Sequence, residues 1–137
     1  MLLSARCEYA IRAVLDLALA GGAQPVRIAE IATRQKIPQK FLEAILADLK
    51  RDGLLESRRG AEGGYRLGRP AEEITVGRVV RAIEGSPSPA GGDEDPLGGL
   101  KREVENSLAA VFDHKSFAEL AREWRDRQTA WVPSWDI

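Results

Sequence analysis

The chain has 137 residues, of which 44% are hydrophobic, and its 20 Lys and Arg against 21 Asp and Glu give a formal net charge of −1. That length and hydrophobic content suit one compact domain with an ordinary core. The single cysteine, Cys7, excludes an internal disulfide and a multi-cysteine metal site, and charged residues interrupt the apolar N-terminal run, which excludes a signal-peptide core and a membrane span there. We therefore expect a cytoplasmic protein.

The charge is unevenly distributed along the chain. Residues 34–69 carry nine Lys and Arg against five Asp and Glu. A local excess of positive charge is typical of a surface that binds a polyanion such as nucleic acid. A solvated surface with chance clustering of basic residues is the alternative explanation.

Near the N-terminus, apolar residues recur at the spacing of one helix face. They are Ala10, Ile11, Val14, Leu15, Leu17 and Ala18. Ser4 can cap the start of this helix, and Gly21-Gly22 can end it. We expect this first helix to be a packing element of the core.

Two further helices follow, separated by a tight turn. The run Arg27 to Ala32 predicts a short helix, and Gln35-Lys36-Ile37-Pro38 predicts the turn. Residues 39–52 predict a second amphipathic helix, for which Pro38 suits the start and Gly53 the end. Its apolar stripe consists of Leu42, Ile45, Leu46 and Leu49. Two helices joined by a tight turn are typical of helix-turn-helix DNA-binding domains.

A change of period predicts a β-hairpin after the second amphipathic helix. Leu55-Glu56-Ser57-Arg58 and Tyr65-Arg66-Leu67 alternate as strands do, and the glycines between them allow a turn. Residues 74–85 then predict a further helix with a Thr75 cap and a Gly85 stop. The order of these elements predicts a mainly α fold with a small β-hairpin, namely a winged helix-turn-helix DNA-binding domain over residues 1–85.

Beyond this domain the sequence predicts a linker and a long helix. Residues 86–96 are rich in Pro, Gly, Ser and acidic residues without periodicity, which indicates an exposed linker. Residues 97–115 predict a helix with a narrow apolar seam, formed by Leu97, Leu100, Val104, Leu108 and Val111. A narrow seam is typical of a helix that faces a partner helix, so we expect a homodimer; packing onto its own domain is the alternative.

Residues 116–137 predict a last short helix and an aromatic tail. Ser116-Phe117-Ala118-Glu119 is a capping box. The tail contains the apolar residues Trp131, Val132, Pro133, Trp135 and Ile137. So much apolar surface indicates docking on the body of the protein or on the partner subunit, with recognition by another protein as the alternative.

The outer face of the second amphipathic helix is the expected DNA-reading surface. Lys40 and Glu43 can reach base edges, and Gln39 can add an adenine or phosphate contact. Lys50 and Arg51 lie further along and suit phosphates. DNA repels an acid on this face unless the acid gains a base contact, so Glu43 indicates selectivity; an ion pair with a helix lysine such as Lys40 is the alternative.

Basic residues of the hairpin predict a second DNA contact. Arg58, Arg59 and Arg66 flank the glycine turn. An arginine at a loop tip can follow a phosphate or enter a narrow minor groove, and Gly60 lets the backbone approach closely. We therefore expect double-stranded DNA as the partner, with an ordinary basic hairpin as the alternative.

Several motifs together resemble a known family. They are Ile28-Ala29-x-Ile31-Ala32, Ile37-Pro38-x-x-Phe41-Leu42-Glu43, Gly53-Leu54-Leu55, Arg59-Gly60-x-x-Gly63-Gly64-Tyr65-x-Leu67 and Ile74-Thr75-Val76-Gly77. Over residues 1–85 this order closely resembles the Rrf2 family of bacterial transcription regulators. The resemblance implies a homodimeric repressor or activator, in which Lys40, Phe41 and Glu43 contact DNA from the recognition helix and Arg59 and Gly60 from the wing.

One departure from the family bears on mechanism. The iron-sulfur members hold their cluster with three cysteines in the loop before the long helix, whereas residues 86–100 contain no cysteine here. Cys7, Glu8 and His114 cannot replace them, so we expect no cofactor. The chain is more similar to the cluster-free, CymR-like branch, which implies a signal from an effector protein or small ligand and a role in cysteine and sulfur or iron-sulfur metabolism.

Three other function classes are alternatives to a DNA-binding regulator. His114 and Cys7 mark no activated nucleophile pair, so we expect no enzyme. Cys7 would suit a redox sensor if it were exposed beside Arg6, although a lone cysteine in an amphipathic helix is more often buried. A winged helix used only for protein contact is the third alternative, and any DNA association it showed would depend little on salt.

Overall fold

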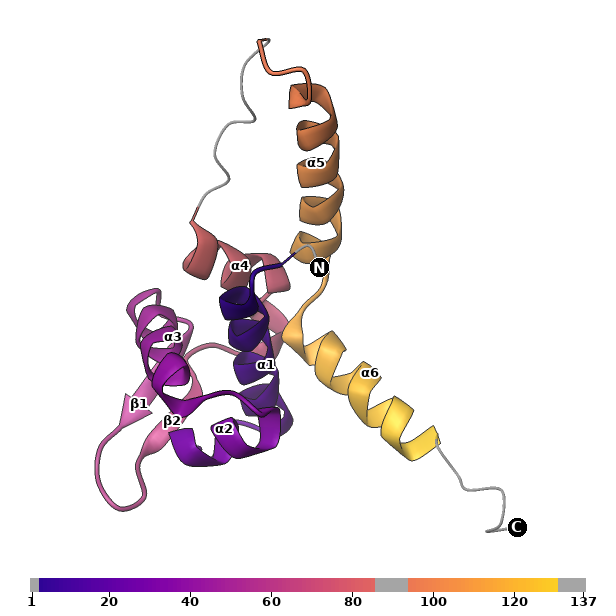
Figure 1. Cartoon of the computed structure of the whole chain (residues 1–137). Helices are drawn as coiled ribbons and strands as arrows, with labels where there is room; N and C mark the ends of the chain where they lie inside the picture. The colour runs from indigo at the N-terminus through magenta and orange to yellow at the C-terminus, as the bar shows by residue number, and fades with distance from the viewer. Residues whose placement is uncertain (1–2, 86–93, 131–137) are drawn as a thin grey trace.

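The computed structural model describes residues 3–85 and 94–130. In chain order the elements are α1 (Ala5–Leu19), α2 (Ile28–Gln35), α3 (Gln39–Arg51), the strands β1 (Leu55–Arg58) and β2 (Gly64–Leu67), the 3-10 helix η1 (Ala71–Glu73), α4 (Val76–Glu84), α5 (Gly98–His114) and α6 (Phe117–Ala130). The strands pair antiparallel, with Leu55 opposite Leu67 and Arg58 opposite Gly64. The mainly α, winged helix-turn-helix fold expected from the sequence is confirmed (Figure 1).

Side-chain caps explain where three of the helices begin. Ser4 Oγ accepts from the Cys7 backbone N–H at 3.1 Å, and Thr75 Oγ1 accepts from that of Arg78 at 3.2 Å. Ser116 Oγ accepts from the Glu119 N–H at 3.1 Å. These bonds satisfy donors that a helix start otherwise leaves without an intrahelical partner. The N-caps predicted at these positions are therefore confirmed.

The turn between α2 and α3 differs from the expectation in detail. α2 continues to Gln35, three residues beyond the predicted run, and its C-cap is Lys36 with φ 56° and ψ 47°. The Ile37 N–H donates to the Ala32 carbonyl at 3.0 Å, which closes the helix end. A left-handed residue reverses the chain there, a position that glycine usually occupies because it has no Cβ.

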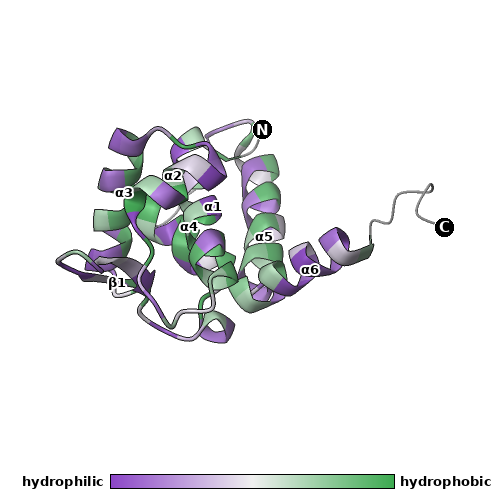
Figure 2. Cartoon of the chain, turned by 90° about the horizontal axis from the view of Figure 1, so that it is seen from below, coloured by the Kyte–Doolittle hydropathy of each residue, from purple (hydrophilic) through white to green (hydrophobic). Residues whose placement is uncertain are grey.

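The core lies where α1, α3 and α4 meet. α1 contributes Ala10, Ala13, Val14 and Leu17, and α3 contributes its predicted stripe of Leu42, Ile45, Leu46 and Leu49, all of them buried. α3 is hydrophobic on the side that faces α1 and hydrophilic on its outer side (Figure 2). Burial of this stripe fixes the opposite face of α3 toward solvent.

A buried carboxylate ties α1 to α2. Asp16 is 4% exposed. Its two oxygens accept from Arg34 Nε at 3.0 Å and Arg34 Nη2 at 2.9 Å, and Gln35 Nε2 donates to it at 3.0 Å. Because a buried charge is costly without partners, this bidentate pair fixes the helix that precedes the turn.

α5 joins the winged domain only at its C-terminal end and then projects away from it (Figure 1). The Val76 N–H donates to the Lys115 carbonyl and the Phe117 N–H to the Ile74 carbonyl, both at 2.9 Å. Arg81 pairs with Asp113 at 2.7 Å, and its guanidinium holds the pKa of that carboxyl below its usual range.

Two of the sequence-based expectations cannot be compared with the structure. Most of the expected linker, residues 86–93, and the aromatic tail, residues 131–137, lie outside the described residues. Within the described part, no helix combines the length and apolar character needed to cross a membrane.

Candidate nucleic-acid interface

Six residues of α3 predicted to contact DNA all lie on its exposed face. They are Gln39, Lys40, Phe41, Glu43, Lys50 and Arg51. Their exposure follows from the buried leucine and isoleucine stripe, because residues on the other side of a helix turn must point outward. α3 therefore offers a ligand an exposed ridge of charged and amide side chains together with one aromatic ring.

The first turn of α3 combines a cation, an aromatic ring and an acid. Lys40 Nζ lies 5.3 Å from the centre of the Phe41 ring, and the Phe41 side chain is 52% exposed. Within residues 3–85 and 94–130, Glu43 has no basic side chain at ion-pair distance. The Lys40–Glu43 pair considered as an alternative is therefore not formed, and the Glu43 carboxylate is available to a partner.

The two basic residues at the end of α3 are already oriented by neighbours. Lys50 Nζ donates to Ser57 Oγ on β1 at 2.6 Å, which links α3 to the hairpin. Arg51 pairs with Asp48 at 3.0 Å, and Asp48 also accepts from Arg6 of α1. Their charges lie at the C-terminal end of α3, where they suit phosphate contacts better than base contacts.

The tip of the hairpin is exposed and basic. Arg58 and Arg59 are exposed, and Gly60 adopts φ +105° with nothing within 4 Å of a Cβ position there. The Gly63 N–H donates to the Gly60 carbonyl at 3.0 Å and closes the turn. Arg66 lies further back on β2, where it pairs across the strands with Glu56 at 3.1 Å, so its charge is shared with a carboxylate.

Backbone contacts hold the hairpin against the start of α2. Val26 and Tyr65 exchange two hydrogen bonds, with Val26 N–H to Tyr65 carbonyl at 2.7 Å and Tyr65 N–H to Val26 carbonyl at 2.8 Å. Arg27, the N-cap of α2, donates to the Ala61 carbonyl in the turn. The Val26–Tyr65 link could not be predicted from the sequence, because no local pattern pairs residues 39 positions apart.

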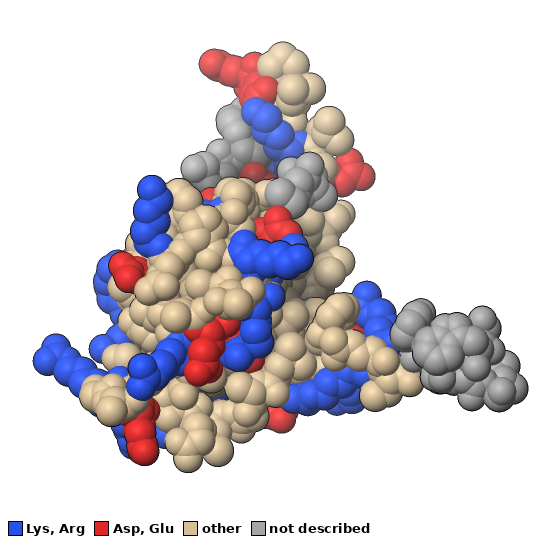
Figure 3. Space-filling view, turned by 60° about the horizontal axis from the view of Figure 1, so that its bottom comes forward, with Lys and Arg blue, Asp and Glu red and all other residues tan. Residues whose placement is uncertain are grey.

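The charged surface agrees with this geometry. Lys and Arg side chains gather along the side of the molecule that carries α3 and the hairpin (Figure 3). The structure thus brings together the predicted residues of α3 and of the hairpin tip, with Arg66 set back. A helix ridge flanked by a basic hairpin matches the major groove and the neighbouring phosphates of duplex DNA.

Cys7 lies away from this surface. Its side chain is fully buried in α1, and this burial, with the nearby Glu84 carboxylate, raises the pKa of the Cys7 thiol to about 11. A thiolate is the reactive form of cysteine, so burial and a raised pKa both oppose reactivity. The structure therefore shows a buried thiol at Cys7, whereas a redox sensor requires an exposed one.

The fold and this surface define a winged helix-turn-helix transcription regulator. The model of the Rrf2 family, described as an iron-dependent transcriptional regulator, matches residues 3–123, so the chain belongs to the Rrf2 family. It is 36% identical over 131 residues to an HTH-type transcriptional regulator of Mycobacterium tuberculosis, covering 88% of this chain and 81% of the relative. It is also 35% identical over 129 residues to the HTH-type transcriptional regulator IscR of Escherichia coli, covering 88% and 80%.

Solved structures of the same kind superpose closely on this chain. T. potens IscR has a TM-score of 0.82 at 30% identity, covering 98% of this chain and 95% of that one. CymR of B. subtilis, described as the global cysteine regulator, has a TM-score of 0.79 at 29% identity, covering 90% and 98%. Relatives of this chain are named as transcriptional regulators, and the protein is a regulator rather than an enzyme.

The family description raises the question of whether these residues fit an iron site. Thiolates are the usual ligands of iron-sulfur clusters, and this sequence contains one cysteine, which is buried and has a raised pKa. The described residues contain no group of three His, Cys, Asp or Glu side chains placed to hold a metal ion. The residues present therefore do not fit an iron-sulfur cluster.

Proposed function

We propose that this protein is a sequence-specific transcription regulator that binds double-stranded DNA as a homodimer, in the cytoplasm, where the chromosome lies. The exposed ridge of α3 beside the basic hairpin is the observation that supports this most strongly. In this proposal α3 enters the major groove, and the hairpin lies on the adjacent backbone. The predicted domain division is retained, with residues 1–85 binding DNA and residues 97–115 forming the dimer.

Each exposed residue of the ridge has a proposed role. Lys40 donates to guanine acceptors, Glu43 accepts from a cytosine amino group, and Phe41 contacts a thymine methyl group. Gln39 contacts an adenine or a phosphate, and Lys50 contacts phosphates that fix the register. Arg51 joins Lys50 on the phosphates.

The hairpin residues are assigned to the DNA backbone. Arg58 and Arg59 approach phosphates or the minor groove, and Gly60 allows close approach of the chain. Arg66 contributes least, because Glu56 already accepts from its guanidinium and offsets its charge. Phosphate contacts of this kind add affinity without sequence preference.

The homodimer is supported by the unpaired apolar seam of α5. Among the described residues, Leu97, Leu100, Val104 and Val111 are 55%, 59%, 40% and 61% exposed, and Leu108 is half-buried. Large apolar side chains aligned on one exposed helix face are stabilised by a second copy of the same helix. A two-fold dimer would present two α3 ridges to an imperfect palindrome.

We further propose that the regulator, acting as a repressor, works without an iron-sulfur cluster and responds to an effector protein or small ligand. The single buried cysteine supports the first part, since it leaves the cluster without its thiolates. Similarity to CymR, described as a global cysteine regulator, supports a role in cysteine and sulfur metabolism, while the family description as an iron-dependent transcriptional regulator keeps iron-sulfur metabolism as the second candidate.

The test is selection of bound genomic fragments by the purified protein, followed by affinity measurements on the enriched site. We expect Glu43→Ala to reduce the preference for that site over one with the contacted base pair changed, by about tenfold. Arg59→Ala should weaken binding to every sequence by about fivefold and flatten the salt dependence.

Arg102→Ala is the matched control, because Arg102 is exposed on α5, away from the ridge. It should leave both affinity and preference unchanged. Failure to enrich any common sequence would refute sequence-specific binding, and an unchanged preference in Glu43→Ala would refute the base-reading role of that carboxylate.

A further inference from the structure

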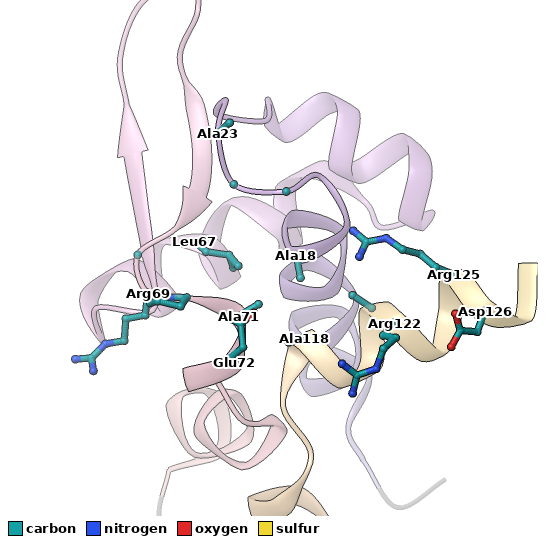
Figure 4. Close-up of a pocket in the computed structure, with 15 residues that line it drawn as sticks. Ala18, Ala23, Leu67, Arg69, Ala71, Glu72, Ala118, Arg122, Arg125 and Asp126 are labelled. Atoms are coloured by element: carbon teal, nitrogen blue, oxygen red, sulfur yellow. The ribbon is translucent and has the colours of Figure 1, made fainter. Parts of the chain in front are cut away.

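A cavity lies beside the contact between α6 and the winged domain. Its volume is about 810 Å³, within the range of small-molecule sites. It is open to solvent and has three walls, namely the end of α1 with the following turn, the segment from Leu67 to Glu72 that leaves the hairpin, and the face of α6 that carries Ala118, Ala121 and Arg122 (Figure 4). We call it the α1–α6 cavity.

The walls of the α1–α6 cavity are lined largely by small residues. Ala18, Gly21 and Gly22 form the wall at the end of α1, and Ala118 with Ala121 forms the wall on α6. Nothing lies within 4 Å of a Cβ position at Gly21 or Gly22. A ligand in this space can therefore approach the backbone of the α1 turn directly.

Guanidinium groups of α6 give the cavity its chemistry. Arg122 and Arg125 both extend from α6 on the side of the cavity, while Arg69 lies at the rim with its end turned outward (Figure 4). Arg125 donates to the Leu19 carbonyl at 3.0 Å, which holds its guanidinium against the wall. In the part of the chain that the structure describes, Arg122 has no carboxylate at ion-pair distance.

Two carboxylates complete the lining. Glu72 and Asp126 lie on opposite walls, one after the hairpin and one on α6. Arginine binds carboxylate and phosphate groups through several parallel donors, whereas a carboxylate accepts from hydroxyl or ammonium groups. The lining therefore suits a polar molecule that carries an anionic group together with a hydrogen-bond donor.

We propose that the α1–α6 cavity binds a small organic anion, a molecule with a carboxylate or phosphate group and a hydroxyl or amino group, held by Arg122 and Arg125. The ligand would bridge α6 and the segment that follows the hairpin. This inference rests on the proposed function: in a transcription regulator the cavity would be an effector site. Its occupant would fix the position of the hairpin relative to α5 and α6.

The test is a titration of the full chain, without DNA, followed by the backbone amide resonances in ¹H–¹⁵N NMR spectra. Citrate serves as the carboxylate probe and glycerol 3-phosphate as the phosphate probe, so the two anion chemistries are distinguished. We expect saturable shifts at Gly21, Gly22 and Arg122 with at least one probe. Arg122→Gln should weaken that binding by about tenfold, since one charge-assisted contact is lost.

Arg102→Gln is the control, because it removes the same charge from an exposed position outside the cavity. The proposal would be overturned by any of three results. These are equal weakening of probe binding by both variants, shifts confined to α3 and the hairpin, and no saturable shift with either probe. Binding of the selected DNA site is measured separately without a probe. If the protein fails to bind DNA but the probe still shifts the cavity resonances, the regulator proposal is refuted and the ligand site stands. If the protein binds DNA but no probe shifts the cavity resonances, only the ligand site is refuted.

Discussion

The position of the hairpin against the start of α2 depends on Gly64. Its φ is +146°, and a Cβ atom there would lie 2.4 Å from the Val26 carbonyl oxygen. We expect Gly64→Ala to lower the free energy of unfolding by about 2–4 kcal/mol in urea titrations, because the added atom meets backbone. Gly99→Ala is the control, since nothing lies within 4 Å of its Cβ position. Equal stability of the two variants would contradict the steric explanation.

Cys7 makes stability depend on alkaline pH. The pKa of its thiol is about 11 in the folded protein against an ordinary value of 9.0. Because the folded protein favours the protonated thiol more than the unfolded chain does, the protonated thiol contributes to the free energy of unfolding. This contribution is fully present below the pKa of the unfolded chain and is lost as the pH rises through the pKa of the folded protein. We expect the free energy of unfolding to fall more steeply between these two pH values in the wild type than in Cys7→Ala. Parallel pH profiles from urea titrations at each pH would show that burial does not perturb the thiol.

At the scale of elements, the Asp16 contact joins α1 to α2. Asp16→Asn keeps the shape of the side chain but removes the charge that Arg34 binds through two nitrogens. We expect a loss of about 1–3 kcal/mol in the free energy of unfolding. Glu30→Gln is the matched control, because Glu30 is exposed and lies 3.8 Å from the same guanidinium. Its loss should stay below about 0.5 kcal/mol, and thermal or urea unfolding that ranks the two variants equally would refute the role of burial.

Periodicity and capping chemistry predicted the helices that carry the candidate site. The α3 stripe follows from spacing alone, and because it is buried, the exposed positions of Lys40 and Glu43 could be predicted with it. The Ser4 and Thr75 caps are likewise local signals. Local signals reach only a few residues along the chain, which limits what they can predict about tertiary contacts.

The features that escaped prediction depend on distant residues or on strain. The end of α2 was missed because Lys36 adopts a left-handed conformation that its residue type does not favour. The Asp16–Arg34 pair joins residues 18 apart, and Val26 meets Tyr65 only in the folded chain. The Arg66–Glu56 pair is different, since the hairpin register alone places the two opposite one another. That register would have indicated that Arg66 is less available to DNA than Arg59.

At the scale of the whole molecule, one compact junction connects the DNA-facing domain to the helix that we expect to dimerise. Arg81 pairs with Asp113 beside the backbone bonds of Ile74 and Val76, so the C-terminal end of α5 is held to α4. The spacing of two α3 ridges in a dimer would follow from this junction and from the pairing of the two α5 helices. Half-sites about 34–36 Å apart are the expected target if the two-fold geometry is the usual one.

Disrupting the α5 seam should separate dimerisation from folding. Val104 is 40% exposed in the single chain, so Val104→Glu places a charge in the proposed interface without burying it within the domain. We expect a monomer in sedimentation equilibrium with unchanged helix content. Affinity for the palindrome should fall by about a hundredfold or more, because a monomer holds one half-site without help from a linked second domain. Arg102→Glu makes a charge change on α5 outside the seam and should preserve the dimer. If the Val104→Glu protein remains dimeric and binds the palindrome normally, the seam does not form the dimer interface. Two-fold recognition of DNA would then need a different interface.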